Sequence, residues 1–419
     1  MLQPDISVNG IITLVVAGLI ATLSKYLLRI KKKHLFNPAA ITAVILDLAG
    51  SGAVIWWVGS LVLAPFAFII GILIVRKLRR FDLFLPFVLA SLVVMLIYGL
   101  LAQQSVSDVM MQSITSWPLI FFGTIMLTEP LTTPPTKKFH IIYGLLVGAL
   151  FAAQFKIGNF YATPELALVI GNIFSFFVSS KQRLVLTFNK KTELAPYIYE
   201  FSFTPNEKLK FKPGQYLEWT LGHHNADDRG IRRFFTITSS PTEDDIKLTV
   251  RTSDKSSTFK KRLLEMQKGE KLMAGSLGGE FTLPEDETKK LAFIAGGIGL
   301  TPFRSMVEYL VDKNQKRDII FFYVCNAEQD FVYKDLFKKA ETVGVKMVYI
   351  VTKPENCSKD FKGKTGYITK ETLTEEVPDL NNRMFFLSGP DAMVQSYKKL
   401  LQTVKIPATH IVTDYFPGF

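Results

Sequence analysis

Cysteine is scarce in this sequence: Cys325 and Cys357 are the only two among 419 residues. An iron–sulfur cluster is usually held by four thiolates, so two cysteines argue against one. They also give no indication of a disulfide framework. Both lie in the C-terminal half, for which we therefore expect a reducing, cytosolic setting.

Histidine is nearly as rare, with five residues in the whole chain. A transmembrane b-type haem needs axial ligands, commonly histidines that face each other from helices. The first 180 residues offer only His34 and His140, each at the edge of an apolar run beside lysines, so we expect no haem. His223 and His224 have no partner at metal-ligand spacing, so we expect surface residues there and no metal site.

Charge is scarce in the first 180 residues, which contain 12 of the 49 basic and 6 of the 37 acidic residues. The whole chain is 48% hydrophobic, and its mean hydropathy of +0.22 is high for a soluble protein. This split predicts a membrane domain first and a soluble part second. Many of the basic residues behind the net charge of +12 flank hydrophobic runs, where they set orientation, so we expect membrane lipids and no nucleic acid as partners.

Seven apolar runs are read as spans of a bilayer, although two of them are short. They are 11–28, 35–49, 53–75, 83–102, 117–127, 139–155 and 164–179. The first has no basic region before it and no small-residue cleavage site after it, so it predicts a retained helix and not a signal peptide.

The loops between these runs differ in charge. "KYLLRIKKK", "RKLRR", "TKK" and "KQR" carry the lysines and arginines, whereas the alternate loops "AGSGA" and "QQSVSDVMMQS" (103–113) carry none. The positive-inside rule then places the N-terminus outside and everything after Lys181 in the cytosol. We expect a multi-pass protein of a bacterial cytoplasmic membrane.

Proline interrupts the two short runs: "LFNPAA" (35–40) opens one and "MLTEPLTTPPT" (126–136) closes the other. Proline removes a helical hydrogen bond, and two such segments in a membrane domain indicate a central site between broken helices. The alternative is that these prolines only cap helix ends, and that Asp47 and Glu129 face water there. The candidate residues for a membrane flavin or an ion are Asn37, Pro38, Asp47, Glu129, Thr132 and Thr133.

These stretches, with "GAVIWWVGS" (52–60) and "YATPELALVIGNIFSFFV" (161–178), resemble the membrane subunits NqrB and RnfD of the sodium-pumping and Rnf redox complexes. The resemblance covers most of residues 35–180. It implies a membrane domain that handles flavin and passes electrons across the bilayer. Those subunits carry a flavinylated threonine in a Ser-Gly-Ala-Thr motif, whereas "SGAV" (51–54) ends in Val54 here. We therefore expect any FMN or riboflavin in the membrane domain to be held without a covalent bond.

From Arg183 onward the sequence changes to short alternating strands separated by turn residues, which predict a small antiparallel barrel. After Lys290 strands alternate with helices, which predicts a parallel sheet with ligands at the carboxyl ends of its strands. The expected fold is multidomain. An all-α polytopic membrane domain (1–180) precedes an antiparallel β-barrel (181–288) and an α/β parallel-sheet domain (289–419).

The stretch "RRFFTITSSP" (232–241) belongs to an ordered set of motifs in the C-terminal half. The others are "KPGQYLEW" (212–219), "SSTFKKRL" (256–263), "GSLGGEF" (275–281), "AGGIGLTPF" (295–303), "GYIT" (366–369), "SGPDAM" (388–393) and the terminal "DYFPGF". In this order they resemble the ferredoxin–NADP⁺ reductase superfamily over residues 183–419. The resemblance implies FAD in the barrel, NADH or NADPH in the parallel-sheet domain, and hydride transfer between the two.

The chemistry of each motif suits a part of FAD. Arg233 presents a fork that matches pyrophosphate, Phe235 a flat face for the isoalloxazine ring, and Thr236 a hydroxyl for the flavin N5 edge. Ser257 and Thr258 precede a helix whose N-terminus favours phosphate. The predicted FAD contacts are Arg233, Phe234, Phe235, Thr236, Val250, Arg251, Ser257, Thr258 and Phe419, the last as a stacking gate or as a hydrophobic plug.

The glycine turn "AGGIGLTP" follows the first parallel strand, where missing side chains let the backbone approach a dinucleotide. "SGPDAM" follows a later strand and puts Ser388, where the family usually has cysteine, beside the nicotinamide. "NAEQD" (326–330) has no arginine for a 2′-phosphate, which favours NADH. The predicted nucleotide contacts are Gly296, Gly297, Gly299, Thr301, Pro302, Asn326, Ser388, Gly389, Pro390 and Met393.

Asp414 matches an acid of the family's C-terminal motif and is available for proton relay, so Thr236, Ser388 and Asp414 are the predicted catalytic residues. The two resemblances together predict a membrane flavoprotein that passes electrons from cytosolic NAD(P)H through FAD to a flavin or quinone in the membrane. Because a hydrocarbon core of about 30 Å is too thick for one electron hop, crossing requires a bound carrier. A flavinylated or iron-reducing protein is the expected acceptor outside. The alternatives are a quinone reductase acting within the membrane and an ion or solute transporter coupled to the reductase part.

Overall fold

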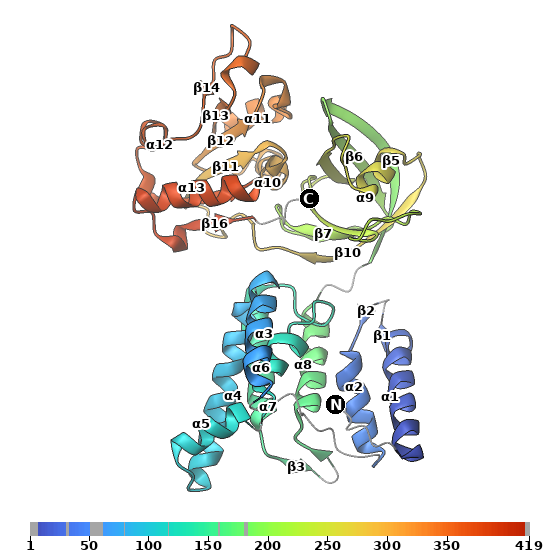
Figure 1. Cartoon of the computed structure of the whole chain (residues 1–419). Coiled ribbons are helices and arrows are strands. Elements are labelled where there is room, and N and C mark those ends of the chain that lie inside the picture. The colour runs from blue at the N-terminus through green and yellow to red at the C-terminus, as the bar shows by residue number, and fades with distance from the viewer. Residues whose placement is uncertain are drawn as a thin grey trace. The chain divides into compact units, whose positions relative to one another are not determined.

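The computed structural model describes residues 7–30, 33–50, 62–78, 80–115, 117–157, 160–179 and 183–414. The chain divides into two compact units, Met1–Lys181 and Gln182–Phe419 (Figure 1). The described part of the first unit is mainly helical, whereas the second contains both large sheets. The "SGAV" stretch and Phe419, to which predictions are attached, lie outside the described residues.

The helical unit is built from helices joined by short loops and two small hairpins. Its helices are α1 (Val8–Leu27), α2 (Pro38–Leu48), α3 (Ala64–Leu78), α4 (Phe81–Leu101), α5 (Val106–Thr115), α6 (Leu119–Phe121), α7 (Lys137–Ala152) and α8 (Pro164–Val178), with a π-helical turn η2 (Phe122–Met126) after α6. The hairpins pair β1 (Arg29–Ile30) with β2 (Lys33–His34), and β3 (Lys156–Ile157) with β4 (Phe160–Tyr161). Helical structure therefore lies within each of the seven predicted apolar runs.

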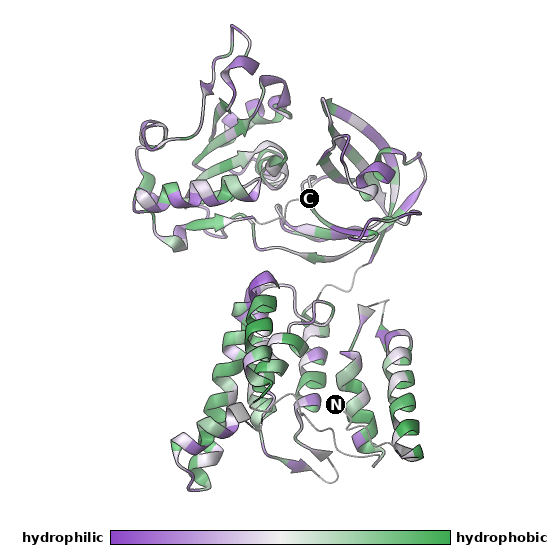
Figure 2. Cartoon of the chain, in the orientation of Figure 1, coloured by the Kyte–Doolittle hydropathy of each residue, from purple (hydrophilic) through white to green (hydrophobic). Residues whose placement is uncertain are grey.

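Two helices of the described residues, α1 from Gly10 and α4, are long and apolar enough to cross a bilayer. Hydrophobic residues dominate the helical unit, as the hydropathy colours of Figure 2 show. Large apolar side chains are exposed along these helices, among them Ile11, Val15 and Leu19 of α1 and Leu85 and Leu89 of α4. The other five predicted spans are shorter helices here, and their crossing of a membrane stays a prediction.

Residues 103–113 are expected to form a loop, and this prediction is wrong because α5 occupies most of them. The Ser105 hydroxyl accepts the Asp108 N–H at 3.1 Å and donates to the Asp108 carboxylate at 2.6 Å. This is the capping pattern Ser-x-x-Asp, which starts a helix by supplying partners for its first N–H groups. The signal was present in "SVSD", but polar composition concealed it.

Helix starts and small residues explain how the helical unit packs. Asn37 and Thr163 cap α2 and α8, each directly before a proline at the first helical position. α7 lies against α4, and a Cβ at Gly144 would meet the Leu83 carbonyl oxygen at 2.5 Å. A Cβ at Gly148 would likewise collide with the Phe87 carbonyl oxygen. Such a Gly-x-x-x-Gly contact is typical of helices that pack inside membranes.

The first part of the second unit is an antiparallel sheet that curls around one core. Its strands are β5 (Leu184–Ala195), β6 (Ile198–Pro205), β7 (Tyr216–Thr220), β8 (Arg232–Thr236), β9 (Ile246–Arg251) and β10 (Lys271–Gly278), in the order β8-β7-β10-β5-β6-β9. The Thr238 N–H donates to the Lys247 carbonyl, which brings the two outer strands together. The short helix α9 (Thr258–Leu264) follows β9, and Trp219 and Phe259 lie in the core.

The second part is a parallel sheet covered by helices. Its strands are β11 (Lys290–Gly296), β12 (Ile319–Cys325), β13 (Val345–Val351), β14 (Lys364–Thr365), β15 (Arg383–Ser388) and β16 (Ile411–Thr413), with helices α10 (Thr301–Asp312), α11 (Lys334–Ala340), α12 (Lys370–Glu376) and α13 (Asp391–Thr403). The order β14-β13-β12-β11-β15-β16 reverses between β11 and β15. Ligands of such sheets bind at this reversal, outside the carboxyl ends of the strands.

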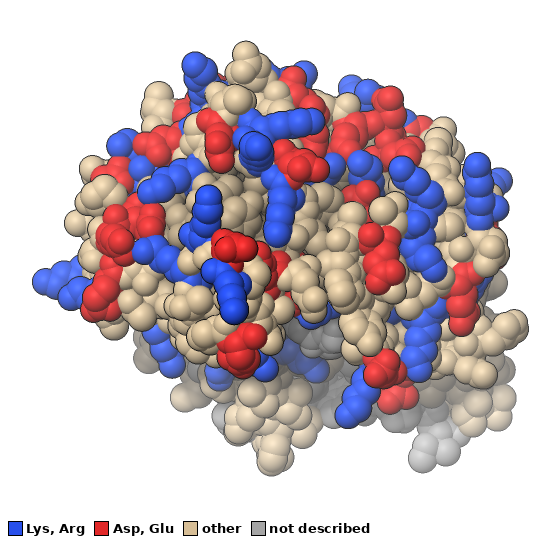
Figure 3. Space-filling model, turned by 90° about the horizontal axis from the view of Figure 1, so that it is seen from above, with Lys and Arg blue, Asp and Glu red and all other residues tan. Residues whose placement is uncertain are grey.

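Helix α10 fastens the parallel sheet to the barrel. Its Arg304 donates to the Thr238 carbonyl at 3.2 Å and is paired with Glu243, and its Ser305 donates to the Ser239 carbonyl at 2.7 Å. The three acceptors lie in the segment that directly follows β8. On the face of this unit shown in Figure 3, acidic and basic side chains are interspersed.

Candidate functional sites

Arg233 is the central cation of the barrel site. Strand β8 pairs with β7 so that Arg233 lies opposite Trp219, and the Arg233 side chain is only 8% exposed. Its Nη1 donates to the carbonyls of Arg229 (2.9 Å) and Gly230 (2.8 Å), and its Nη2 to Asp227 (2.7 Å). Its Nε is buried without a hydrogen-bond partner among the described residues. One edge of the guanidinium therefore remains available for an anion.

Thr236, at the end of the same strand, presents a second buried group of this kind. Its Oγ1 has no hydrogen-bond partner in the described part of the chain, and the residue is nearly inaccessible. Phe235 is partly buried against Phe259, whereas Phe234 is 52% exposed and meets Tyr216 edge to face. Buried polar atoms without partners are uncommon in folded proteins, and here two of them, Arg233 Nε and Thr236 Oγ1, lie on one strand, where both could bond a ligand.

The remaining predicted FAD contacts among the described residues are engaged within the protein. Val250 is buried in the barrel core, and Arg251 forms an ion pair with Asp330 of the parallel-sheet part at 3.1 Å. Ser257 caps α9, and the Thr258 hydroxyl is bonded to the Asp227 N–H. The Thr258 hydroxyl also meets His223 at 3.0 Å, so His223 is partly buried and the expectation of a surface residue holds only for His224.

The two glycine-containing turns at the strand reversal lie against each other. Gly297 begins a 3₁₀ turn, η3 (Gly297–Leu300), with a φ of +52° that suits glycine. A Cβ at Gly299 would come within 2.5 Å of the Gly389 nitrogen, and one at Gly296 would collide with the Met393 side chain. Thr301 and Pro302 then start α10. The structure thus brings together the predicted residues of "AGGIGLTP" and "SGPDAM".

Ser388 and Asp414 meet at the same edge of the sheet. Ser388 ends β15 fully buried, and its hydroxyl donates to the Asp414 carboxylate at 3.3 Å. The Asp414 N–H donates to the Leu387 carbonyl, which holds the two residues on neighbouring chain segments. A hydroxyl bonded to a carboxylate can pass a proton between a ligand and solvent.

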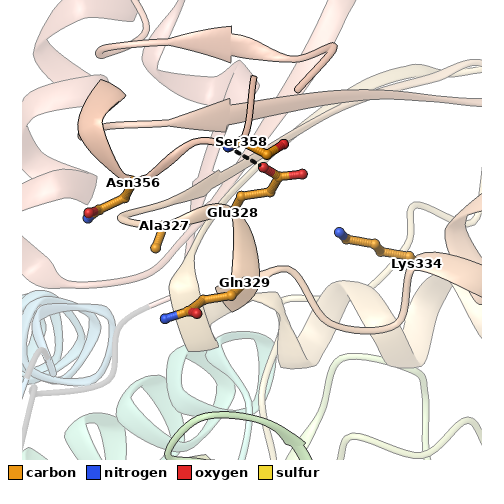
Figure 4. Close-up of a pocket in the computed structure, with 6 residues that line it drawn as sticks. All are labelled: Ala327, Glu328, Gln329, Lys334, Asn356 and Ser358. Atoms are coloured by element: carbon orange, nitrogen blue, oxygen red, sulfur yellow. Dashed lines mark hydrogen bonds between the residues drawn. The ribbon is translucent and has the colours of Figure 1, made fainter. Parts of the chain in front are cut away.

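A cavity of about 480 Å³ lies beyond the carboxyl end of β12 (Figure 4). It is lined by Ala327, Glu328, Gln329, Lys334, Asn356 and Ser358. The Glu328 carboxylate accepts the Ser358 N–H at 2.8 Å, and this hydrogen bond lowers the pKa of Glu328. Asn326 lies beside the cavity, where its own carbonyl accepts from Asn356. Glu328 and Lys334 were not among the predicted contacts, although Glu328 falls within the quoted "NAEQD".

Another cavity, of about 450 Å³, lies in the helical unit, where the two proline-interrupted segments meet. It is lined by Lys25, His34, Phe36, Asn37, Pro38, Ala39, Ile125, Met126, Glu129 and Leu131. Asn37 donates from its side-chain amide to Glu129 at 2.7 Å, and Thr132 donates to the same carboxylate at 3.3 Å. Asn37, Pro38 and Glu129 of the two segments therefore line one cavity, and Thr132 is linked to it through its hydrogen bond to Glu129.

Two predicted residues do not join this cavity. Asp47 is exposed near the end of α2, and Thr133 is bonded to the Pro130 carbonyl. A buried amide that was not predicted lies behind the site: Asn172 accepts the Asn37 N–H at 2.7 Å and donates to Tyr143. A lone asparagine in the apolar run "LALVIGNIFSFF" was the available signal, because polar residues inside such runs are usually paired or functional.

The residues of the barrel and the strand reversal fit a flavin and a nicotinamide dinucleotide. The unpartnered Arg233 Nε suits a phosphate oxygen, and the unpartnered Thr236 hydroxyl suits a heteroaromatic edge. The glycine turn leaves backbone open to a dinucleotide. Among the described residues no group of three or more His, Cys, Asp or Glu side chains converges as a metal site would require.

Comparisons with known proteins agree with this geometry. Residues 293–399 match the family model of the oxidoreductase NAD-binding domain. A glycine betaine monooxygenase reductase subunit of Pseudomonas aeruginosa is 26% identical over 194 residues, which cover 46% of this chain and 52% of that protein. The gamma subunit of sulfhydrogenase 2 from Pyrococcus furiosus is 28% identical over 211 residues, covering 47% of this chain and 69% of that protein.

A solved structure supports the fold. The flavohemoglobin of Malassezia yamatoensis, determined with bound FAD and haem, aligns with a TM-score of 0.51 at 19% identity, covering 70% of this chain and 72% of that one. This chain spans about half the length of the Pseudomonas relative. The second unit therefore contains an oxidoreductase NAD-binding domain, is similar to NAD(P)H-dependent flavin oxidoreductase modules of the ferredoxin–NADP⁺ reductase type, and shares the fold of the flavohemoglobin.

Proposed function

We propose that the chain is a membrane-bound, NADH-dependent flavin oxidoreductase that moves electrons from the cytosolic side into the bilayer and across it. The observation that carries the reductase step is the pair of unpartnered buried atoms on one strand, Arg233 Nε and Thr236 Oγ1. They lie in the module whose parallel sheet reverses at the glycine turn. A cation for phosphate and a hydroxyl for a ring edge on one strand match a dinucleotide-like flavin better than any single anion.

The residues have distinct roles in this proposal. Bound FAD would supply the conversion of a two-electron hydride into single electrons. Arg233 would hold the pyrophosphate, and Thr236 would orient the reactive ring edge. Ser388 would position the nicotinamide beside that edge, and Asp414, bonded to the Ser388 hydroxyl, would hold or release a proton. The buried strand ends exclude water from this place.

The helical unit supports the membrane part of the proposal. Apolar side chains exposed on α1 and α4 suit lipid contact, and the Gly144 and Gly148 contact with α4 is of the membrane type. The cavity between Asn37 and Glu129 combines apolar walls with a few polar groups, as cofactor sites do. We propose that it takes a non-covalent flavin, or a quinone, as the carrier that a span of about 30 Å demands. An extracytosolic flavinylated or iron-reducing protein would be the final acceptor.

Reconstituted vesicles test this function. The full chain is placed in proteoliposomes that enclose ferricyanide, which does not cross lipid, and NADH is added to molecules whose reductase module faces outward. We expect NADH-dependent loss of ferricyanide absorbance inside and two flavins per chain, one of them FAD. Reduction of an added quinone without reduction of trapped ferricyanide would instead identify a quinone reductase acting within the membrane. One FAD as the only redox group, with ion flux on NADH addition, would favour a coupled transporter.

Glu328 is expected to make the enzyme prefer NADH. Its ionised carboxylate lines the cavity beyond β12 and would repel a 2′-phosphate, whereas it can accept a hydrogen bond from a ribose hydroxyl. Lys334 lies on another side of the cavity and points into it (Figure 4). Glu328→Gln should therefore raise the ratio of kcat/KM for NADPH over NADH about tenfold. The exposed Glu355→Gln, which leaves the cavity unchanged, is the control and should not alter the ratio.

A further inference from the structure

The loop between β7 and β8, residues 222–230, brings a carboxylate to the place expected to hold phosphate. Asp227 Oδ1 accepts from Arg233 Nη2 at 2.7 Å, and Asp227 Oδ2 accepts the Thr258 N–H at 3.3 Å. In return, the Asp227 N–H donates to the Thr258 hydroxyl at 3.1 Å. Arg233 and Thr258 are both predicted contacts of the FAD pyrophosphate, and one side chain of the protein itself holds them together.

More positive than negative charge gathers around Asp227. Arg229 approaches its Oδ2 at 3.3 Å, and Arg233 lies on the other oxygen. Two guanidinium groups on one carboxylate leave a net positive charge, which suits a ligand with a larger negative charge than Asp227 supplies.

The loop is anchored so that it can move without breaking the sheet. The Leu221 N–H donates to the Ile231 carbonyl at 3.0 Å, directly beyond the last pair of the β7–β8 ladder. Glycines stand at both ends of the loop: Gly222 has open space around it, and Gly230 has a φ of +66°. Withdrawal of Asp227 would leave the β7–β8 ladder intact, although the loop also contacts Arg233 through the carbonyls of Arg229 and Gly230 and Thr258 through His223.

We propose that Asp227 is an internal anion that competes with the FAD pyrophosphate for Arg233 and Thr258, so that loop 222–230 sets the affinity of the module for FAD. The proposal rests on the FAD site of the proposed function. Burial raises the pKa of Asp227, but hydrogen bonds from the Arg229 N–H and from Arg233 outweigh burial and lower this pKa to about 2. Asp227 is therefore ionised at neutral pH, where the competition is present.

The test measures flavin affinity and not turnover. The full chain is purified in detergent, its flavin is removed, and FAD or riboflavin is titrated back while the quenching of flavin fluorescence is followed. We expect Asp227→Asn to lower the Kd for FAD about tenfold, because a neutral amide competes less well for a guanidinium. The Kd for riboflavin, which has no phosphate, should stay within twofold.

Asp228→Asn is the matched control. Asp228 is the next residue along the chain and is exposed, so the substitution removes the same charge without removing the contacts of Asp227. An equal gain in FAD affinity for Asp228→Asn would reduce the effect to net charge and overturn the proposal. A higher Kd for Asp227→Asn would overturn it as well, because Asp227 would then position Arg233 for the ligand. Asp227→Ser should shift the Kd for FAD in the same direction as Asp227→Asn. The second variant keeps the test valid if one of the two does not fold. If Arg233→Ala leaves the FAD Kd unchanged, the FAD site of the proposed function fails separately.

Discussion

Replacing Arg233 with alanine is expected to raise the Kd for FAD about 100-fold and to leave the purified protein largely without yellow colour. Hydrogen bonds to a charged group are worth about 1.5–3 kcal/mol each, and about 2.7 kcal/mol corresponds to 100-fold in affinity. Arg233 also holds the carbonyls of Arg229 and Gly230, so its loss frees the loop that borders the site. The measurement is FAD per chain, from absorbance near 450 nm, together with a titration of the flavin-free protein.

Arg232→Ala provides the control for this experiment. Arg232 is the neighbouring strand residue, but its side chain is 56% exposed and lies 3.7 Å from Glu218, so its removal should leave FAD content unchanged. Arg233→Lys keeps the charge but loses the fork, and it should recover only part of the affinity. Full FAD content in purified Arg233→Ala would contradict the assignment of Arg233.

Gly299→Ala is expected to lower kcat/KM for NADH about 100-fold while FAD stays bound. A Cβ at this position would collide with the Ser388 carbonyl oxygen and come within 2.5 Å of the Gly389 nitrogen and Cα. Both are backbone groups, which cannot turn aside as a flexible side chain can. The two turns must part, and overpacking of this kind costs about 1–3 kcal/mol. The rate at which NADH bleaches the bound flavin, followed in a stopped-flow instrument, reports the effect directly.

Gly222→Ala tests whether any added methyl group has this effect. A Cβ at Gly222 would have no heavy atom within 4 Å, so NADH should bleach the flavin of this variant at the same rate as in the unaltered protein. An unaltered bleaching rate in Gly299→Ala would mean that the nicotinamide does not approach the Ser388 turn. Loss of flavin from Gly299→Ala would instead show that the collision spreads into the barrel.

The sequence predicted the reductase module well because its chemistry depends on local motifs. The run "AGGIGLTP" predicts a glycine-rich turn before a helix that starts at Pro302, and it forms η3 and the start of α10. The pairing of this turn with "SGPDAM" also followed, since the carboxyl ends of parallel strands share one edge. Asp227 could not be predicted in the same way, because its position depends on how a nine-residue loop folds back onto Arg233.

The helical unit was harder to predict for a physical reason. Apolar composition indicates that a segment is buried, but it does not say whether lipid or protein buries it. The two proline segments lie next to each other, since Asn37 and Glu129 are bonded, and a binding site between them stays a prediction. Pro38 also begins α2 as an ordinary first helical residue, so the capping alternative describes the same proline equally well. Asp47 was predicted at the site but is exposed. Its position within an apolar run does not determine the helix face on which its side chain lies.

The contacts of α10 with the barrel affect the thermal unfolding of the reductase module and the response of flavin reduction to solvent viscosity. Arg304 and Ser305 donate to the carbonyls of Thr238 and Ser239, two and three residues after Thr236, and α10 begins directly after the glycine turn. Thr236 and the glycine turn 297–300 are thus held together as one rigid structural unit. A calorimetric scan of this module should show barrel and parallel sheet melting in a single peak, and glycerol should slow the flavin bleaching step very little.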